Sequence, residues 1–371
     1  MRVLVIGAGP GGLAAAVRLR ERGGDGLEVV LITRGAGATH LAGTVPAALG
    51  ERPAADFTCV LALDGVACRG GEATAVDGGG ATVDATRIDA DAVIAAPGLE
   101  LDDEQLPPWS RARSGWDPAA GAAAAAALDA VPGGRLVIAV CGLPHRCPPA
   151  PYSLAMSLAD RHRRSGRFTK VCVASPEPFP LLALGGDAPG FLIESCAGAG
   201  VELVGRFDVD LAASEDGTLR ARDGRELAYE LAFLVPPHRR PQLLASFGGD
   251  GPLVPVGPRG ESSVPGVFVV GDAADTGLPR AAGVAEAQGR TAADAVLARL
   301  GLAEPCAPHV PDAVCYVRLA GGGVSRIRVR YPDGVPPDGA PRVAIDSPSP
   351  DLAHAVEGER RRFLRLAGGR G

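Results

Sequence analysis

The chain has 371 residues, 46% of them hydrophobic and 22% charged, which is ordinary for a globular protein with a large core in two or three domains. With a net charge of −6, nothing in the composition indicates a nucleic-acid partner. No stretch reaches the roughly 20 apolar residues needed to cross a bilayer, and a strand begins at once without a signal peptide. We therefore expect a cytoplasmic protein whose eight cysteines are mostly free thiols.

Residues 2–23 have the pattern strand, glycine turn, helix. Gly7, Gly9 and Gly12 show the G-x-G-x-x-G spacing that is typical of dinucleotide binding. The first two glycines let the backbone turn and approach a pyrophosphate, and the third lets the helix pack closely on the strand. Backbone N–H groups at the helix start then face the phosphates. Two more residues of this turn, Pro10 and Gly11, belong to the predicted dinucleotide site.

Residues 27–34 supply the second strand of the βαβ unit and end in Thr33 and Arg34. An acidic residue is expected at this strand end, because a carboxylate there binds the adenosine ribose. Threonine offers only a neutral hydrogen bond, which is weaker. We predict that Thr33 and Arg34 contact the dinucleotide with reduced affinity. A Rossmann unit with an occluded site stays open as the alternative.

Two later segments decide which dinucleotide is bound. Residues 88–100 form a buried strand that ends in an Ala-Pro-Gly turn, with Ala96 and Gly98 at the predicted site. Residues 264–301 contain a strand, a Gly-Asp pair and a long amphipathic helix. With the N-terminal glycines, these segments resemble the three FAD signatures of the pyridine nucleotide–disulfide oxidoreductase superfamily. The resemblance implies an α/β protein with two Rossmann-like domains, one binding FAD and one inserted, and a small C-terminal region.

In that superfamily the aspartate of the Gly-Asp pair, here Asp272, hydrogen-bonds the ribityl chain of FAD. The helix that follows points its N-terminus at the flavin, where its N–H groups stabilise the negative charge of the reduced ring. The resemblance places Gly271, Asp272, Pro279, Arg280 and Ala281 around the cofactor.

Within the superfamily, residues 146–156 and 271–290 resemble the sulfide:quinone oxidoreductase and flavocytochrome c sulfide dehydrogenase branch, with Arg280 where lysine is usual. This resemblance implies a redox-active Cys147 and a partner, Cys315, on a strand after the FAD helix. It also implies FAD-dependent oxidation of sulfide, or of a small thiol or persulfide. Electrons would pass through the flavin to a quinone-type acceptor.

The loop at 141–152 follows a buried strand, where a second glycine fingerprint would be expected, yet it contains four prolines. Prolines lack the N–H groups that a pyrophosphate needs, so the loop argues against NAD(P)H binding. It presents Cys147 just before a helix, and the helix dipole together with His145 predicts a lowered thiol pKa. His145 could equally be a surface residue, and Cys141 fits an inert core cysteine.

Some features depart from the pattern of the branch. Ser153 stands where relatives commonly have a glutamate that could accept a proton. Residues 39–50 match the segment that attaches FAD covalently in flavocytochromes but contain no cysteine, so we expect non-covalent FAD. Residues 351–368 could form one short amphipathic helix with a basic face, which leaves peripheral membrane contact open.

The remaining cysteines have neither motif context nor metal-ligand spacing, so we predict no metal site. They are Cys59, Cys68, Cys172, Cys196 and Cys306. The predicted domains are a first FAD-binding segment at 1–105, an inserted Rossmann-like domain at 106–235, a second FAD-binding segment at 236–305 and a C-terminal region at 306–371. Two other functions stay open: a soluble enzyme acting on an organic sulfur compound, and a flavin-binding partner protein without sulfide activity.

Overall fold

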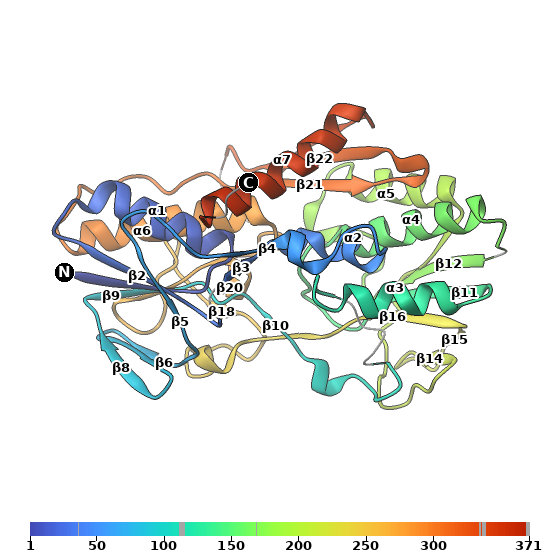
Figure 1. Ribbon diagram of the computed structural model, residues 1–371, viewed down its shortest axis with the longest axis horizontal. Helices are drawn as coiled ribbons and strands as arrows, with labels where there is room; N and C mark the ends of the chain where they lie inside the picture. Colours follow the sequence, from blue (N-terminus) through green and yellow to red (C-terminus); the bar gives the residue numbers. More distant parts are fainter. Residues whose placement is uncertain (36, 111–115, 168, 334, 336–338, 369–371) are drawn as a thin grey trace.

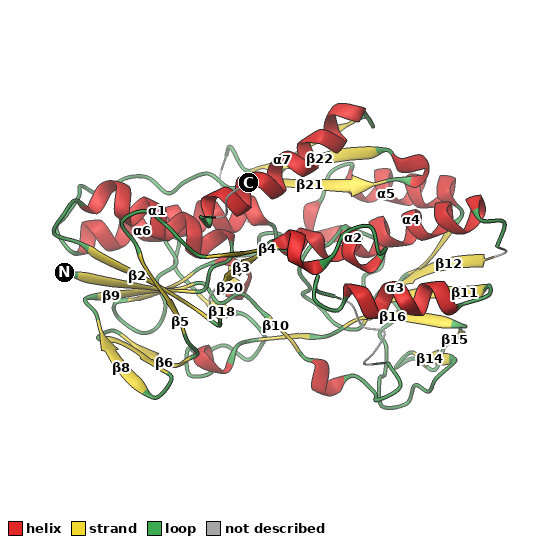
Figure 2. Ribbon diagram, viewed as in Figure 1, coloured by secondary structure: helices red, strands yellow, loops and turns green. Residues whose placement is uncertain are grey.

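The computed structural model contains two parallel β-sheets side by side along its long axis (Figure 1). It describes every residue except 36, 111–115, 168, 334, 336–338 and 369–371. Helices lie against both sheets (Figure 2). The predicted α/β class with Rossmann-like sheets is confirmed. None of the described helices is long and apolar enough to span a membrane.

The first sheet has five parallel strands in the order β19-β9-β1-β2-β5. Its strands are β1 (Arg2–Ile6), β2 (Glu28–Thr33), β5 (Ala67–Gly70), β9 (Ala92–Ala95) and β19 (Val267–Val269). Helices α1 (Pro10–Gly23) and α6 (Ala282–Arg299) bury their small and aliphatic residues against one face. An antiparallel sheet of β6 (Ala73–Asp77), β7 (Gly80–Val83) and β8 (Thr86–Asp89) packs on the other face.

The second sheet has four parallel strands in the order β13-β12-β11-β16. They are β11 (Gly134–Val140), β12 (Thr169–Ala174), β13 (Val201–Val204) and β16 (Leu231–Val235). One face packs against α3 (Gly121–Ala130), α4 (Ala150–Arg164) and α5 (Ala188–Ala199). The other face is covered by the hairpin of β14 (Thr218–Arg220) and β15 (Glu226–Ala228). The loop between β11 and α4 holds the prolines and Cys147.

The C-terminal region contacts both halves of the molecule. Strands β21 (Asp312–Arg318), β22 (Val324–Arg330) and β23 (Arg342–Asp346) form an antiparallel sheet. Strand β21 packs against both α4 and α6. Helix α7 (Pro350–Leu366) then runs back toward the first sheet, where its Phe363 joins the core beside α1 (Figure 1). These residues therefore cover the space between the two parallel sheets.

Short elements complete the chain. They are β3 (Gly37–Thr39), α2 (Thr44–Ala48), β4 (Thr58–Val60), β10 (Glu100–Leu101), β17 (His238–Arg239), β18 (Val254–Pro255) and β20 (Ala274–Asp275), together with 3-10 turns at Leu41–Gly43, Ala54–Phe57, Asp103–Gln105, Leu182–Leu184, Gln242–Leu244, Gly271–Ala273 and Ala320–Gly322. Strands β10 and β17 pair antiparallel where the chain leaves the first sheet and where it returns.

Candidate active site

A large cavity of about 930 Å³ lies where these parts meet. Its walls come from the N-terminal glycine turn, the 39–46 segment, the end of the β9 strand, the start of α6, the proline-rich loop, β21 and α7. Of the predicted dinucleotide residues, those that line it are Gly7, Gly9, Pro10, Gly11, Thr33, Arg34, Ala96, Gly98, Gly271, Asp272, Arg280 and Ala281. Gly12 and Pro279 do not line it.

The glycine turn has the shape that a bound pyrophosphate requires. Gly7 has a φ of +104°, and a Cβ there would lie 2.2 Å from the carbonyl oxygen of Ala96. A Cβ on Gly12 would lie 1.9 Å from the carbonyl oxygen of Gly7, so this glycine serves the close packing of α1 on β1. Around Gly9, in contrast, a Cβ would meet nothing within 4 Å, and the residue borders the open cavity directly before α1.

The end of β2 has a carboxylate nearby, although it comes from another strand. Arg34 forms an ion pair of 3.2 Å with Glu100, and both residues line the cavity with Thr33. Glu100 is also paired with Arg239 at 3.5 Å. Sequence reasoning missed Glu100, which follows the Ala-Pro-Gly turn, lies in β10 and meets the end of β2 only in the folded protein.

The part of the cavity wall formed by Asp272, Arg280 and Arg146 holds a buried group of charges. Burial raises the pKa of Asp272, while Arg280 and Arg146 act in the opposite direction. Arg280 is 9% exposed, and its Nη1 donates to the carbonyl oxygen of Ala274 at 3.2 Å. Its Nε has no partner among the described residues, and the same holds for Nδ1 of His40 on the cavity wall. Such unpaired polar atoms, with the glycine turn, fit a polar cofactor.

The two predicted redox cysteines line this same cavity. Cys147 has a left-handed backbone with φ +54°, and its N–H donates to the carbonyl oxygen of Arg280 at 3.4 Å. Its own carbonyl accepts from the N–H of Ala150 at 2.9 Å. Cys315 lies in the middle of β21, opposite Ile327 of β22. Both cysteines pack against one hydrophobic cluster, and both are free thiols.

The two thiols are not activated as the sequence predicted. Burial raises the pKa of Cys147 to about 11, although the N–H of Ala150 and the charge of Arg146 act to lower it. Burial, and then the proximity of Cys147, raise the pKa of Cys315 well above its usual value. The predicted low thiol pKa is wrong, because loss of water outweighs the helix end. Cys141 is buried, as expected for an inert core cysteine.

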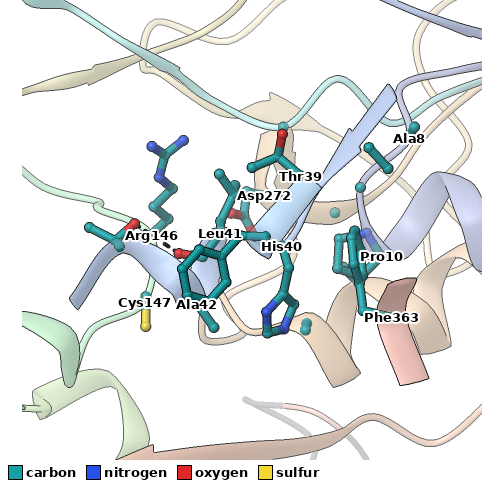
Figure 3. Close-up of a pocket in the computed structure, with 18 of the residues that line it drawn as sticks. Ala8, Pro10, Thr39, His40, Leu41, Ala42, Arg146, Cys147, Asp272 and Phe363 are labelled. Carbon is teal, nitrogen blue, oxygen red and sulfur yellow. Dashed lines mark hydrogen bonds between the residues drawn. The ribbon is translucent and has the colours of Figure 1, made fainter. Parts of the chain in front are cut away.

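His145 is not a partner of the thiol. It is buried beside His238, with ring centroids 6.4 Å apart, and does not line the cavity. Burial lowers its pKa to about 4, so the ring is neutral. The cation that acts on the Cys147 thiol is the preceding residue, Arg146, which sequence reasoning missed. In Figure 3 its guanidinium and the Cys147 sulfur point in opposite directions. Its Nη2 donates to the carbonyl oxygen of Trp116 at 2.6 Å.

Ion pairs hold the cavity wall on the side of the C-terminal region. Ser153 of α4 accepts a hydrogen bond from the backbone N–H of Arg318 in β21 at 3.1 Å. The guanidinium of Arg318 binds Glu51 through two hydrogen bonds of 2.7 and 2.8 Å. On α7, Glu357 pairs with Arg52 at 3.2 Å. All five residues line the cavity.

Helix α7 lies closer to the cofactor motif than its sequence suggested. Phe363 packs on His40, with ring centroids 5.1 Å apart, and Figure 3 shows the pair beside Pro10 of the glycine turn. The arginines that gave this helix a basic face are paired with acids: Arg360 and Arg361 with Glu357, and Arg362 with Glu286.

The comparisons with known proteins agree with this geometry. Residues 2–98 match the FAD binding domain family. The sulfide:quinone oxidoreductase from Aquifex aeolicus has a TM-score of 0.82 at 19% identity, covering 99% of this chain and 91% of that one. Residues 2–98 thus match an FAD binding domain, and the chain as a whole shares the fold of that sulfide:quinone oxidoreductase. The predicted cofactor, FAD, is therefore confirmed.

Two further structures share the fold at lower identity. A chain in the mitochondrial ATP synthase of Tetrahymena thermophila has a TM-score of 0.75 at 12% identity, covering 89% of this chain and 86% of that one. Reduced CoADR-RHD of Bacillus anthracis has a TM-score of 0.64 at 15% identity, covering 96% of this chain and 74% of that one. The same architecture thus occurs in proteins with different roles.

Proposed function

We propose that this protein oxidises sulfide, or a small thiol or persulfide, through a redox pair formed by Cys147 and Cys315, and passes the electrons through FAD to a quinone-type acceptor. One observation carries the proposal. Two cysteines from segments far apart in sequence line the cavity that the FAD-binding motifs also line, and both pack against the same hydrophobic cluster. The likeness to a sulfide:quinone oxidoreductase supports it.

The resting pair in this proposal is a disulfide. The raised pKa values of both thiols argue against a free thiolate that waits for substrate. Hydrosulfide attacks the sulfur of Cys147, the bond between the two cysteines breaks, and Cys147 carries the new sulfur as a persulfide. Cys315 leaves with the bonding electron pair and takes up a proton. FAD, when bound, would supply the two-electron acceptor for this pair.

The chain's own residues have defined tasks. The backbone contact between Cys147 and Arg280 fixes the cysteine loop beside the start of α6. Arg146 and Arg280 place positive charge around Asp272, which would favour negative charge on a cofactor bound at this part of the cavity. Ser153 ties α4 to β21 and so keeps the two cysteine-bearing segments together.

A second candidate is a soluble enzyme that acts on an organic sulfur compound. The ion pairs Glu51–Arg318 and Arg52–Glu357 on the cavity wall favour it, because charged side chains suit a polar substrate better than an apolar quinone. Flavin reduction by an organic thiol but not by sulfide would select this candidate. Reduction by sulfide, followed by reoxidation with a water-soluble quinone, would select the first.

The test is anaerobic titration with sulfide while the flavin absorbance is followed. In Cys315→Ser we expect FAD to stay bound while sulfide reduces it at least ~10³-fold more slowly, because the nucleophilic exchange has lost one partner. Cys68→Ser is the matched control, since that sulfur lies outside the cavity near the carbonyl oxygen of Val66. Reduction of the Cys315→Ser flavin at the wild-type rate overturns the proposal.

A further inference from the structure

We propose that Glu359 of α7 is the group that gives a proton to Cys315 when the disulfide opens and takes it back when the disulfide forms again. This role rests on the proposed Cys147–Cys315 chemistry and adds the proton carrier that this chemistry needs. It is assigned from the position of Glu359, from the pairing of the acids around it and from its ionisation.

Glu359 and Cys315 belong to different elements but line the same cavity. The carboxyl group of Glu359 interacts electrostatically with the thiol of Cys315 and with the hydroxyl of the next residue, Tyr316. The charged groups that act on the two cysteines differ. Arg146 and Asp272 act on Cys147, whereas the acid that acts on Cys315 is Glu359.

The neighbouring acids are already engaged by arginines, and Glu359 is not. Glu357, one half-turn earlier on α7, is held by Arg360 and Arg361, and its pKa is lowered to about 2. Glu286 of α6 is bound by Arg362 at 2.6 Å. Within the described part of the chain, Glu359 makes no hydrogen bond and no ion pair. Its carboxyl group is therefore free to exchange a proton.

The surroundings of Glu359 bring its ionisation into the neutral range. Burial raises its pKa to about 7, with Arg362 acting downward, Glu286 upward and Arg326 of β22 downward. From β21 it faces Cys315 and Tyr316, which are neutral at this pH because burial raises both of their pKa values. A carboxyl group with a pKa near 7 can serve as acid and as base at neutral pH.

The position on α4 that borders the same cavity cannot take this task. Ala150 and Ser153 are the α4 residues on its wall, and the Ser153 hydroxyl already accepts from the backbone of Arg318.

When hydrosulfide opens the disulfide, Cys315 leaves with the electron pair, and the proton of the Glu359 acid ends on its sulfur. The products are the Cys147 persulfide, the Cys315 thiol and the Glu359 carboxylate. One negative charge enters with hydrosulfide and one remains on Glu359.

The experiment measures how fast Cys315 becomes a free thiol. Oxidised holoenzyme is mixed anaerobically with sulfide, quenched in acid and alkylated, and Cys315 is quantified by mass spectrometry. The rate for wild type is divided by the rate for Glu359→Gln at each pH, so that the ionisation of sulfide itself cancels. We expect a ratio of about 100 at pH 6, in the usual range for general acid catalysis. The ratio should fall steadily as the pH passes through 7.

Glu357→Gln is the control on the same helix. The ratio of the wild-type rate to the Glu357→Gln rate should not change with pH, even if the loss of ion pairs lowers the melting temperature of this variant. Glu359→Asp should restore part of the rate at pH 6. In one outcome, the disulfide forms in Glu359→Gln while the ratio of the wild-type to the variant opening rate stays the same at every pH. That result overturns the role of Glu359 and leaves the proposed function standing. Absence of a Cys147–Cys315 disulfide from the oxidised wild-type protein overturns the proposed function, and this role with it.

Discussion

Ser153 and Arg318 join the two segments that carry the redox cysteines. The hydroxyl oxygen of Ser153 accepts a hydrogen bond from the backbone N–H of Arg318 at 3.1 Å. Ser153 is in the first turns of α4, just after the Cys147 loop, and Arg318 ends the strand that contains Cys315. Ser153 therefore has a structural task on the cavity wall.

Ser153→Ala should lower the free energy of unfolding by about 1 kcal/mol, because the N–H of Arg318 loses its partner. The Cys147–Cys315 disulfide should also form more slowly, since β21 is no longer fixed to α4. Denaturant unfolding and mass spectrometry of the oxidised protein measure the two effects. Ser157→Ala, on the same helix, is the control and should change neither. Equal disulfide formation in both variants would contradict this role.

Gly7 and Gly9 should respond differently to the same added methyl group. Gly7→Ala should disrupt folding of the first domain, because the Cβ would lie 2.2 Å from a carbonyl oxygen at a φ of +104°. Gly9→Ala meets no atom within 4 Å, so its apo stability should stay within about 0.5 kcal/mol of wild type. Its methyl group would still project into the cavity where the pyrophosphate is expected, so FAD affinity should fall.

Thermal unfolding of the FAD-free proteins and titration with FAD separate these two effects. If Gly9→Ala binds FAD as tightly as wild type, the pyrophosphate does not approach the chain at this turn.

The reactivity of Cys147 should follow its raised pKa of about 11. In the reduced protein, alkylation of Cys147 should be slow at pH 8 and increase about tenfold per pH unit up to that value, because only the thiolate reacts. Arg146→Gln should shift the profile to higher pH, since the charge of Arg146 favours the thiolate, whereas Arg146→Lys should retain most of the effect. Residue-specific mass spectrometry after timed alkylation gives the profile. A midpoint near pH 7 would contradict the burial argument.

The parts of the site that depend on local chain geometry could be predicted from the sequence. Three local patterns each place a characteristic residue type at the end of a strand, where a particular backbone turn requires it. They are the glycine turn at Gly7, the buried strand before Ala96 and the Gly-Asp pair at Asp272. Strand ends of a parallel sheet meet at one edge, so the three segments had to converge once the sheet was assigned. For this reason the α/β class and the cofactor followed from the sequence.

The electrostatic properties of the site could not be predicted in this way. The sequence placed Cys147 before a helix, which suggested a reactive thiolate, but burial in the shared cluster raises its pKa instead. It placed His145 two residues away, yet the ring turns toward His238. Desolvation depends on everything packed around a group, and that packing comes from distant segments.

The sequence by itself determined that this chain builds a parallel sheet with an FAD turn, because turn shape and strand burial are encoded over a few neighbouring residues. Only the tertiary structure decided that α7 returns to the cavity, so that Glu359 lines the same wall space as Cys315. Glu357 and Glu359 are two residues apart on one helix. The pKa of Glu357 is lowered chiefly by Arg360 and Arg361 of that helix, whereas burial among segments distant in sequence raises the pKa of Glu359.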